Sequence, residues 1–230
     1  MTRERRFYVE DLDSETLALS SEESHHLVQV LRLREGAEVS LFDGKGRAAK
    51  AEVVTIGKTV VTLRSLSSEP SRESSLSLTV AVSPPKGDRM SVLVQKLTEL
   101  GVHRIVPIAA ERGRDEKSLE RWRRIALEAC KQSGRSLLPH IDEPCDLAAL
   151  VRAKEGFLLA AHPGAPPLAR LEAPRIIAFV GPEGGWSKRE MKILTSSKVT
   201  LFGLGPRTLR TETAAISVAT LLQYLVGDLT

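Results

Sequence analysis

Short apolar runs of strand length, separated by turn sequences, fill the first part of the chain. Strands are predicted where β-branched and aromatic residues gather, at residues 6–9, 39–42, 51–54 and 59–63. Turns are predicted between them, at Asp-Gly-Lys-Gly (43–46) and Gly-Lys (57–58). One helix interrupts the strands, because Ser20 and Glu23 fit a capping box and Gly36 fits a helix end. We therefore expect a small β-barrel in this part of the chain.

A polar, serine-rich stretch at residues 65–75 marks a change of pattern and is predicted to be a linker. Beyond it, apolar runs of strand length alternate with apolar residues at helical spacing, which indicates a parallel sheet covered by helices. Strands are predicted at residues 76–82, 104–109, 157–161, 176–180 and 199–202. Helices are predicted at residues 90–100 and 119–129, from a Ser187–Glu190 capping box onward, and at 211–226. The predicted fold class is α/β, with domains at residues 1–70 and 71–230.

Composition and charge narrow the class of protein. Hydrophobic residues make up 42% of the 230 residues and charged residues 27%, as in a globular protein with a core. The sequence pI of about 9.2 is one weak mark of nucleic-acid binding. Cys130 and Cys145 form no CxxC pair and have no partner at a metal-ligand spacing, so we expect neither disulfides nor a metal site. Because no apolar segment resembles a signal peptide or a membrane span, we expect a cytoplasmic protein that contacts no membrane.

Three predicted strands of the second domain end in unusual loops. They are Ala-Ala-His-Pro-Gly at 160–164, Gly-Pro-Glu-Gly-Gly-Trp at 181–186 and Gly-Leu-Gly-Pro-Arg at 203–207. Ligands of open α/β sheets bind at the carboxyl ends of strands, and glycine lets backbone groups approach a ligand closely. The phosphate-binding patterns GxxxxGK[ST] and GxGxxG are absent from the sequence. One such loop indicates only a tight connection, but three in one half of the chain favour a site for a nucleoside cofactor.

Two longer segments make a family resemblance specific. FVGPEGGWSKREM (179–191) and LGPRTLRTETAAISVATLLQ (204–223) resemble the signature segments of the SPOUT methyltransferases, and more narrowly of the RsmE family of 16S rRNA uridine-N3 methyltransferases. Three further segments are similar to that family: RRFYV (5–9), KGDRMSVLVQKLTELGVHRIVPI (86–108) and RWRRIALEACKQSGR (121–135). The resemblance covers nearly the whole chain in the right order. One small departure is Trp186, where the family more often has phenylalanine.

The resemblance implies a PUA-like N-terminal barrel that helps to bind RNA, and a SPOUT domain with a C-terminal trefoil knot that holds S-adenosylmethionine. It also implies a homodimer that forms through the SPOUT domain and acts on 16S rRNA or the small ribosomal subunit. The last predicted helix is almost free of charged residues and is expected to serve as core and dimer interface. Applied to the three loops, the resemblance implies cofactor contacts at Ala160, Ala161, His162, Gly181, Glu183, Gly184, Leu201, Gly203, Leu204, Gly205, Leu209, Thr211 and Thr213.

Methylating uridine N3 requires removal of its proton or stabilisation of the anion, and it needs no metal because the methyl donor is already activated. Arg210 is the candidate that stabilises uracil O2 or O4 as charge develops. Arg207 fits that role and, equally well, phosphate binding or a salt bridge with Glu212. Glu183 is expected to accept hydrogen bonds from the cofactor or the base, or to act as general base, with a loop cap as its alternative. His162 fits a loop histidine near the cofactor better than a proton carrier.

Clustered arginines indicate a surface that follows an RNA backbone, although isolated surface arginines usually carry no such meaning. The candidate RNA contacts are Arg5, Arg6, Arg112, Arg124 and Arg135. A uridine in an RNA helix hides its N3 edge, so the target must be unpaired or flipped out. Two other functions stay open at this point. One is a SPOUT enzyme that methylates a ribose 2′-OH or a tRNA base, and the other is a non-catalytic RNA-binding assembly protein.

Overall fold

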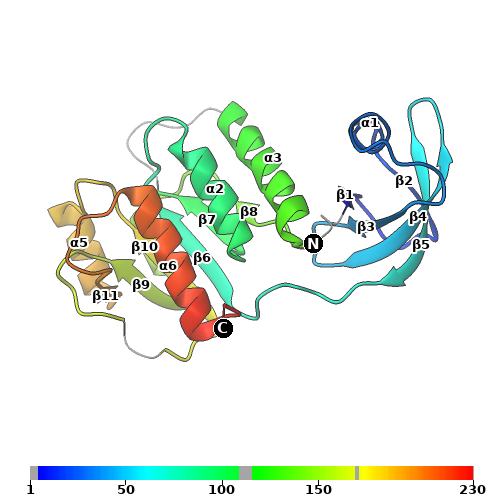
Figure 1. Ribbon diagram of the computed structural model, residues 1–230. Coiled ribbons are helices and arrows are strands. Elements are labelled where there is room, and N and C mark those ends of the chain that lie inside the picture. The colour runs from blue at the N-terminus through cyan, green and yellow to red at the C-terminus, as the bar shows by residue number, and fades with distance from the viewer. Residues whose placement is uncertain (1–4, 109–115, 169–170, 230) are drawn as a thin grey trace. The chain divides into compact units, whose positions relative to one another are not determined.

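The computed structural model describes residues 5–108, 116–168 and 171–229 (Figure 1). The chain divides into two compact units. The first unit comprises Met1–Glu73 together with Leu127–Leu138, and the second unit comprises Ser74–Ala126 and Pro139–Thr230. Residues 127–138 fall within the predicted second domain, and the sequence pattern gave no sign that they belong to the first unit.

The first unit is built on a mixed five-stranded sheet with the order β1-β3-β4-β5-β2. Its strands are β1 (Arg6–Tyr8), β2 (Thr16–Ala18), β3 (Glu38–Phe42), β4 (Ala48–Ile56) and β5 (Val61–Ser68). β1 runs parallel to β3, and the other neighbouring strands are antiparallel. Phe7, Leu41 and Leu63 are fully buried in its core. The four predicted strands are confirmed. β2 was missed because Leu17 is its one buried residue, which leaves no apolar run to recognise.

The helix predicted after Ser20 is shorter and less regular than expected. α1 (Ser21–His25) leads directly into a π-helical turn, η1 (His26–Val30). The Ser20 hydroxyl accepts a hydrogen bond from the Glu23 backbone N–H at 3.2 Å, as the capping prediction requires. The Glu23 side chain, however, is buried and forms an ion pair with Lys131. A tertiary contact therefore replaces the second half of the predicted capping box.

Residues 127–138 complete the core of the first unit. They are the C-terminal part of α3 (Glu116–Ser133) and the turn that follows it. Cys130 is fully buried in a cluster with Phe42, and Leu138 packs against the same cluster. Burial raises the pKa of the Cys130 thiol to about 12. Cys130 is therefore an unreactive core residue and not a nucleophile.

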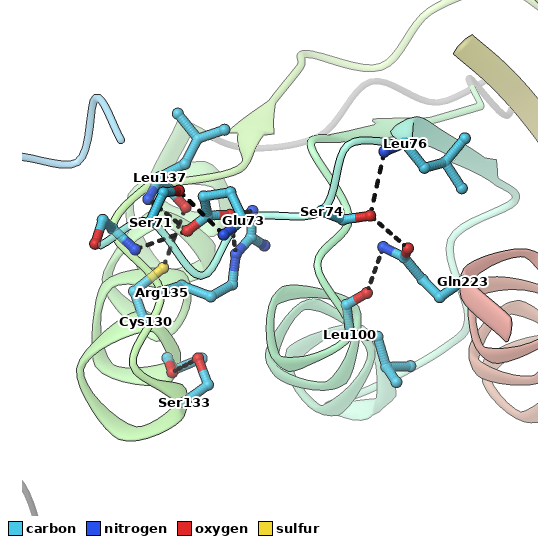
Figure 2. A network of polar contacts seen from close by, with 12 residues as sticks. Ser71, Glu73, Ser74, Leu76, Leu100, Cys130, Ser133, Arg135, Leu137 and Gln223 are labelled. Atoms are coloured by element: carbon cyan, nitrogen blue, oxygen red, sulfur yellow. Dashed lines mark hydrogen bonds and ion pairs between the residues drawn. The ribbon is translucent and has the colours of Figure 1, made fainter. Parts of the chain in front are cut away.

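A buried ionic network ties Glu73 to this segment (Figure 2). The Glu73 carboxylate accepts from Arg135 Nε at 2.9 Å, and its Oε2 lies 2.8 Å from Arg135 Nη2. It also accepts from the backbone N–H groups of Ser136 and Leu137 at 2.7 and 3.0 Å. Arg6 Nη2 donates to the Arg135 carbonyl at 3.2 Å and to the Ser136 hydroxyl at 3.1 Å. All of these groups lie inside the first unit.

This network corrects two predictions. The serine-rich stretch 65–75 is not a free linker, because β5 extends to Ser68 and Glu73 is held by its ion pair. Arg6 and Arg135 were predicted to contact RNA, but these residues are only 6% and 4% exposed. Guanidinium groups committed to buried partners are not available to an RNA backbone. We therefore assign both arginines to the stability of the first unit.

Replacing Glu73 with glutamine is expected to lower the free energy of unfolding near pH 7 by about 2 kcal/mol, since hydrogen bonds to charged groups contribute about 1.5–3 kcal/mol. Burial alone would raise the pKa of Glu73, but the charge of Arg135 and the two backbone N–H donors hold that pKa below its ordinary value of 4.5. A carboxylate with a lowered pKa stabilises the fold above its unfolded pKa, and the contribution is lost as the pH falls through the folded pKa. The deficit of the variant should therefore shrink below about pH 4.5.

Urea titrations near pH 7, 5 and 4 measure this dependence. Glu10→Gln is the control, because Glu10 is an exposed carboxylate of the same unit. A deficit for Glu73→Gln that is the same at every pH would contradict the assignment of the ion pair.

The second unit contains a six-stranded sheet in which all neighbouring strands are parallel, in the order β11-β9-β10-β6-β7-β8. Its strands are β6 (Ser77–Val82), β7 (Arg104–Pro107), β8 (His140–Ile141), β9 (Phe157–Ala161), β10 (Arg175–Val180) and β11 (Thr200–Phe202). The α/β class is confirmed, and so are the five predicted strands. β8 was missed because two residues are too few to make a pattern. Ala109, at the predicted end of β7, lies outside the described residues.

Helices cover both faces of this sheet (Figure 1). They are α2 (Arg89–Glu99), the N-terminal part of α3, α4 (Leu147–Ala153), α5 (Lys188–Ser196) and α6 (Thr211–Val226). Alternate residues of β10 face different layers. Ile176 and Ala178 share a core with α2 and α6, while Ile177 and Phe179 share another with α4 and α5. Strands buried on both faces have nearly continuous apolar sequences, which is why these strands could be predicted.

Gln223, near the end of α6, anchors that helix through its buried amide (Figure 2). Its Oε1 accepts from the Ser74 hydroxyl at 2.8 Å, and its Nε2 donates to the Leu100 carbonyl at 2.9 Å. The residues before β6 and after α2 are thereby fixed to the last helix. The outer face of α6 is open, with Tyr224 65% exposed. The dimer interface on this helix and the trefoil knot stay predictions.

The structure also bears on the expectation that the chain contacts no membrane. Across residues 5–108, 116–168 and 171–229, no helix combines the length and the apolar character that crossing a bilayer requires.

Candidate functional site

The three glycine-containing loops meet at one pocket in the second unit, at the carboxyl ends of β9, β10 and β11. Residues from these loops and from the start of α6 line it: Ala161, His162, Pro163, Val180, Gly181, Pro182, Glu183, Gly185, Trp186, Leu204, Gly205, Arg207, Thr208, Leu209, Thr211 and Ala214. Because parallel strands end at the same edge of a sheet, loops that are far apart in the sequence converge here. This edge is where open α/β sheets bind ligands.

The first and third loops are fastened to each other by backbone hydrogen bonds. His162 N–H donates to the Phe202 carbonyl at 2.9 Å, and Gly203 N–H donates to the Pro166 carbonyl at 2.8 Å. A Cβ at residue 203 would lie 2.2 Å from the Ala165 carbonyl oxygen, so only glycine fits this crossing. A close approach of two backbones therefore shapes one wall of the pocket.

Trp186 closes the second loop. Its indole N–H donates to the Ala161 carbonyl at 3.0 Å. Its ring lies against Gly181, where an added Cβ would come within 2.9 Å of it. Ser187 and Glu190 form the predicted capping box at the start of α5, with both reciprocal hydrogen bonds present. The loop is thus held at its two ends, and tryptophan at this position is part of its packing.

Helix α6 begins at the pocket. Thr211 is buried, and its hydroxyl donates to the Gly181 carbonyl at 3.3 Å, which joins the third loop to the second. Arg210 occupies the N-cap position without a side-chain capping bond. Gly205 has a φ of +100° and open space where a Cβ would be, so the backbone of the third loop stays accessible there.

The lining of the pocket is mainly apolar side chains and backbone groups. Leu204, Leu209 and Ala214 supply apolar surface, and the charged residues Glu183 and Arg207 are exposed. Such a lining suits an uncharged nucleoside better than a phosphate group, which requires clustered N–H donors and cations. Within the described residues, no group of His, Cys, Asp and Glu side chains is arranged to hold a metal ion.

Most of the predicted cofactor residues line this pocket, namely Ala161, His162, Gly181, Glu183, Leu204, Gly205, Leu209 and Thr211. Ala160, Gly184, Leu201, Gly203 and Thr213 lie outside its described lining. Ala160 is fully buried in the sheet and Leu201 pairs with it, and their contacts with the cofactor stay predictions. Val180, Trp186 and Ala214 also line the pocket but were not predicted to do so. The available signal was that Trp186 belongs to the second loop, that Val180 directly precedes this loop, and that Ala214 closely follows the third.

A second hollow adjoins the pocket and is lined by Arg89, Glu183, Thr208, Leu209 and Arg210. Arg89, the first residue of α2, forms an ion pair with Glu183, and its Nη1 lies 3.5 Å from Glu212 Oε1. The hydrogen bond to Glu183 and the nearby charge of Glu212 raise the pKa of Arg89 above its ordinary value. Sequence reasoning missed Arg89, because its partners lie far along the chain.

The three candidate catalytic residues lie around these two hollows. Glu183 belongs to both, Arg207 lines the pocket and Arg210 lines the second hollow. Both arginines are exposed. Among the described residues, Glu212 is paired with Arg89, so the salt bridge considered between Glu212 and Arg207 is not formed. The chemical roles of these residues, and that of the half-buried His162, stay predictions.

The remaining predicted RNA contacts differ in their exposure. Arg5, just before β1, and Arg124, on α3, are exposed. Arg112 lies outside the described residues. Arg6 and Arg135 are buried in the first unit. Among the described residues of this set, a phosphate could therefore reach Arg5 and Arg124.

Comparison with known proteins now identifies the family. A model of the RNA methyltransferase domain matches residues 72–223, and a model of the RNA methyltransferase PUA domain matches residues 19–64. The ribosomal RNA small subunit methyltransferase E of Bacillus subtilis is 30% identical over 233 residues, covering 92% of this chain and 91% of that protein. The chain belongs to the ribosomal RNA small subunit methyltransferase E (RsmE) family.

Solved structures agree with this assignment. An RsmE from Neisseria gonorrhoeae, bound to S-adenosyl methionine, superposes with a TM-score of 0.91 at 34% identity, covering 99% of this chain and 100% of that one. A methyltransferase from Legionella pneumophila, in complex with the same cofactor, gives 0.88 at 34% identity over 99% and 100% of the two chains. The RsmE resemblance, the SPOUT-type sheet with its PUA-like N-terminal domain and the assignment as an RNA methyltransferase are thereby confirmed.

Proposed function

We propose that this RsmE protein transfers a methyl group from S-adenosylmethionine to N3 of a uridine in the 16S rRNA of the small ribosomal subunit. The observation that carries the proposal is the pocket where three loops meet, with Glu183, Arg207 and Arg210 around it. Relatives named for methylation of small-subunit rRNA, and structures bound to S-adenosyl methionine, support the substrate and the cofactor. The choice of N3 rests on the family resemblance.

The pocket is proposed to hold the cofactor by apolar contact and backbone hydrogen bonds. Leu204, Leu209 and Ala214 suit the faces of an adenine ring, and the backbone at Gly181 and Gly205 suits its polar edge. Bound S-adenosylmethionine supplies a methyl group that a positively charged sulfur has already activated. The protein then has to hold the acceptor nitrogen in line, which contributes roughly 7–11 kcal/mol in well-oriented reactions.

Residues beside the pocket are proposed to stabilise the negative charge that develops on uracil and to accept the proton that leaves N3. In the reaction N3 forms a bond to the methyl carbon while the carbon–sulfur bond breaks, the sulfur keeps the electron pair, and the N3 proton leaves. Glu183 is proposed to accept the N3–H hydrogen bond and to receive or guide that proton. Arg210 is proposed to donate to a uracil carbonyl as negative charge spreads onto it. Arg207 is proposed as a second donor or as a contact to the RNA phosphate.

The two predicted domains are proposed to have different roles, one in RNA binding and the other in methyl transfer. Residues 1–70 contact RNA, with Arg5 as an exposed cation, and residues 71–230 carry out methyl transfer, with Arg124 as a further phosphate contact. The open face of α6 is proposed as the homodimer contact, because Tyr224 is a large and mostly exposed aromatic residue there. A substrate in the small ribosomal subunit fits an enzyme of the cytoplasm.

Calorimetric titration with S-adenosylmethionine, with NAD and ATP as controls, tests the first part of the proposal. We expect S-adenosylmethionine alone to bind, at about one per chain or one per dimer. Small subunits that lack the modification should then gain one methyl group, which mass spectrometry would locate on a uridine base. A methyl group on a ribose or in tRNA would overturn the proposed substrate. No cofactor binding, even with small subunits present, would favour an RNA-binding assembly protein.

A further inference from the structure

Glu212 has a buried oxygen that no described residue satisfies. The residue lies in the first turn of α6, and its side chain is only 14% exposed. Oε1 is 3.5 Å from Arg89 Nη1, whereas Oε2 has no hydrogen-bond partner among the described residues. A largely buried carboxylate in this position depends on the positive charge beside it. Glu212 therefore acts as a fixed anchor for the guanidinium group of Arg89.

Arg89 connects this anchor to the second loop. The same Nη1 forms an ion pair with Glu183, whose side chain is 54% exposed at the rim of the second hollow. Arg89 Nε donates to the Lys86 carbonyl at 3.1 Å, which fixes the guanidinium plane from another side. The Arg89 guanidinium thus joins the largely buried carboxylate of Glu212 on α6 to the exposed carboxylate of Glu183 on the loop, and it fixes where Glu183 lies.

Stability does not account for the pair of Arg89 and Glu183. Ion pairs between partly exposed side chains contribute little to folding, because water screens the charges and both side chains lose freedom. The pair is nevertheless held by two further contacts of Arg89, with Glu212 and with the Lys86 carbonyl. These contacts instead determine where the Glu183 carboxylate lies, at the edge of the proposed cofactor pocket.

The second hollow has polar groups that complement uracil. A carboxylate accepts hydrogen bonds, and the guanidinium groups of Arg89 and Arg210 only donate them. The N3 edge of uracil has one N–H donor between two carbonyl acceptors. Cytosine has no hydrogen on N3, so its lone pair would face the carboxylate of Glu183 without a hydrogen bond. The hollow therefore fits uridine and disfavours cytidine.

We propose that Arg89, held by Glu212, is a positioning residue that directs Glu183 at N3 of a uracil bound in the second hollow. Glu183 is then the residue that selects uridine over cytidine. This inference rests on the proposed function, because it takes a uridine in RNA as the substrate. It adds the first turn of α2 to the loops that build the site.

Variants of Arg89 and Glu212 test the positioning role. Arg89→Ala is expected to lower kcat with small subunits about 30- to 100-fold, because a displacement of about 1 Å at a reacting centre can cost 10²-fold. Its Kd for S-adenosylmethionine should stay within about twofold of wild type, whereas its Tm should fall, because the largely buried carboxylate of Glu212 loses the positive charge beside it. Arg89→Lys and Glu212→Gln should fall between Arg89→Ala and wild type, because each keeps part of the contact.

Lys96→Ala is the matched control, because Lys96 is a partly exposed cation on the same helix that pairs with Glu99. It should leave kcat unchanged. If Arg89→Ala keeps the kcat of wild type, the positioning role is overturned. It is equally overturned if Arg89→Ala lowers Tm and cofactor affinity together with kcat, because that result describes a residue needed for the fold alone.

Small subunits reconstituted with cytidine at the target position test the selective role of Glu183. Wild-type protein should methylate them at least about 100-fold more slowly than the uridine form, since a site built to accept a hydrogen bond rejects an analogue that lacks the donor. Glu183→Gln has an amide that can donate to cytosine N3, so it should narrow this ratio about tenfold or more. An unchanged ratio would overturn the role of Glu183. If the wild-type protein does not methylate the uridine form, the proposed function itself is overturned. If the wild-type protein is active and the variants are unaffected, only this inference is overturned.

Discussion

Alanine in place of Arg210 is expected to slow methyl transfer about 100- to 1,000-fold, while the affinity for S-adenosylmethionine changes by less than about threefold. Loss of one donor to a developing negative charge has an effect of this size. Arg210 is exposed and lines the second hollow, and its side chain makes no capping bond to α6. The variant should therefore lose methyl-transfer activity while helix α6 stays folded.

Single-turnover transfer to small subunits, measured beside calorimetry with the cofactor, separates these two effects. Lys192→Ala is the matched control, because Lys192 is also exposed and lies on α5, outside the described lining of either hollow. Equal losses of transfer rate and of cofactor affinity would contradict a role for Arg210 in the reaction and would make it a cofactor-binding residue.

Alanine in place of Gly203 should reduce the affinity for S-adenosylmethionine by more than about 100-fold, or about 2.7 kcal/mol. The added methyl group would lie 2.2 Å from the Ala165 carbonyl oxygen, and no side-chain rotation relieves a clash between two backbones. The first loop would have to move, and with it the part of the pocket wall formed by Ala161 and His162. Overpacking of this kind should also lower the free energy of unfolding by about 2–3 kcal/mol.

Thr200→Ala, at the exposed start of the same strand β11, is the control for this substitution. It should change the free energy of unfolding by less than about 0.5 kcal/mol and leave cofactor binding intact. Calorimetry and urea titration of both variants measure the difference. Normal cofactor affinity in Gly203→Ala would mean that the crossing of the two loops does not shape the pocket.

Elements with a repeating burial pattern could be predicted from the sequence, and short elements could not. α6 and β9 have the predicted bounds, because each presents an apolar pattern along its whole length. β2, β8 and α4 are short, and their stability comes from neighbours rather than from a repeat of their own. The serine-rich stretch looked like a linker because Glu73, which is part-buried, finds its partner Arg135 62 residues further on.

The place of the site could be predicted, but its charged network could not. Loops that follow parallel strands must meet at one edge, so three loops sufficed to locate the pocket. Arg89 and Glu183 are 94 residues apart, and only the assembled second unit brings them together. Arg6 donates to the carbonyl of Arg135 across 129 residues. Both arginines were expected at the surface because arginine is seldom buried without a partner, and a sequence does not reveal distant partners.

The discontinuous first unit has a consequence for how the protein is made. Its core includes Cys130 and Leu138 beside Phe42, and its ionic network joins Glu73 to Arg135. A nascent chain that has emerged only to Glu73 would lack these partners. Domains commonly fold during synthesis in order from the N-terminus, but this unit must wait until residue 138 has left the ribosome. The first part of the protein to be translated therefore cannot be the first to complete its folding.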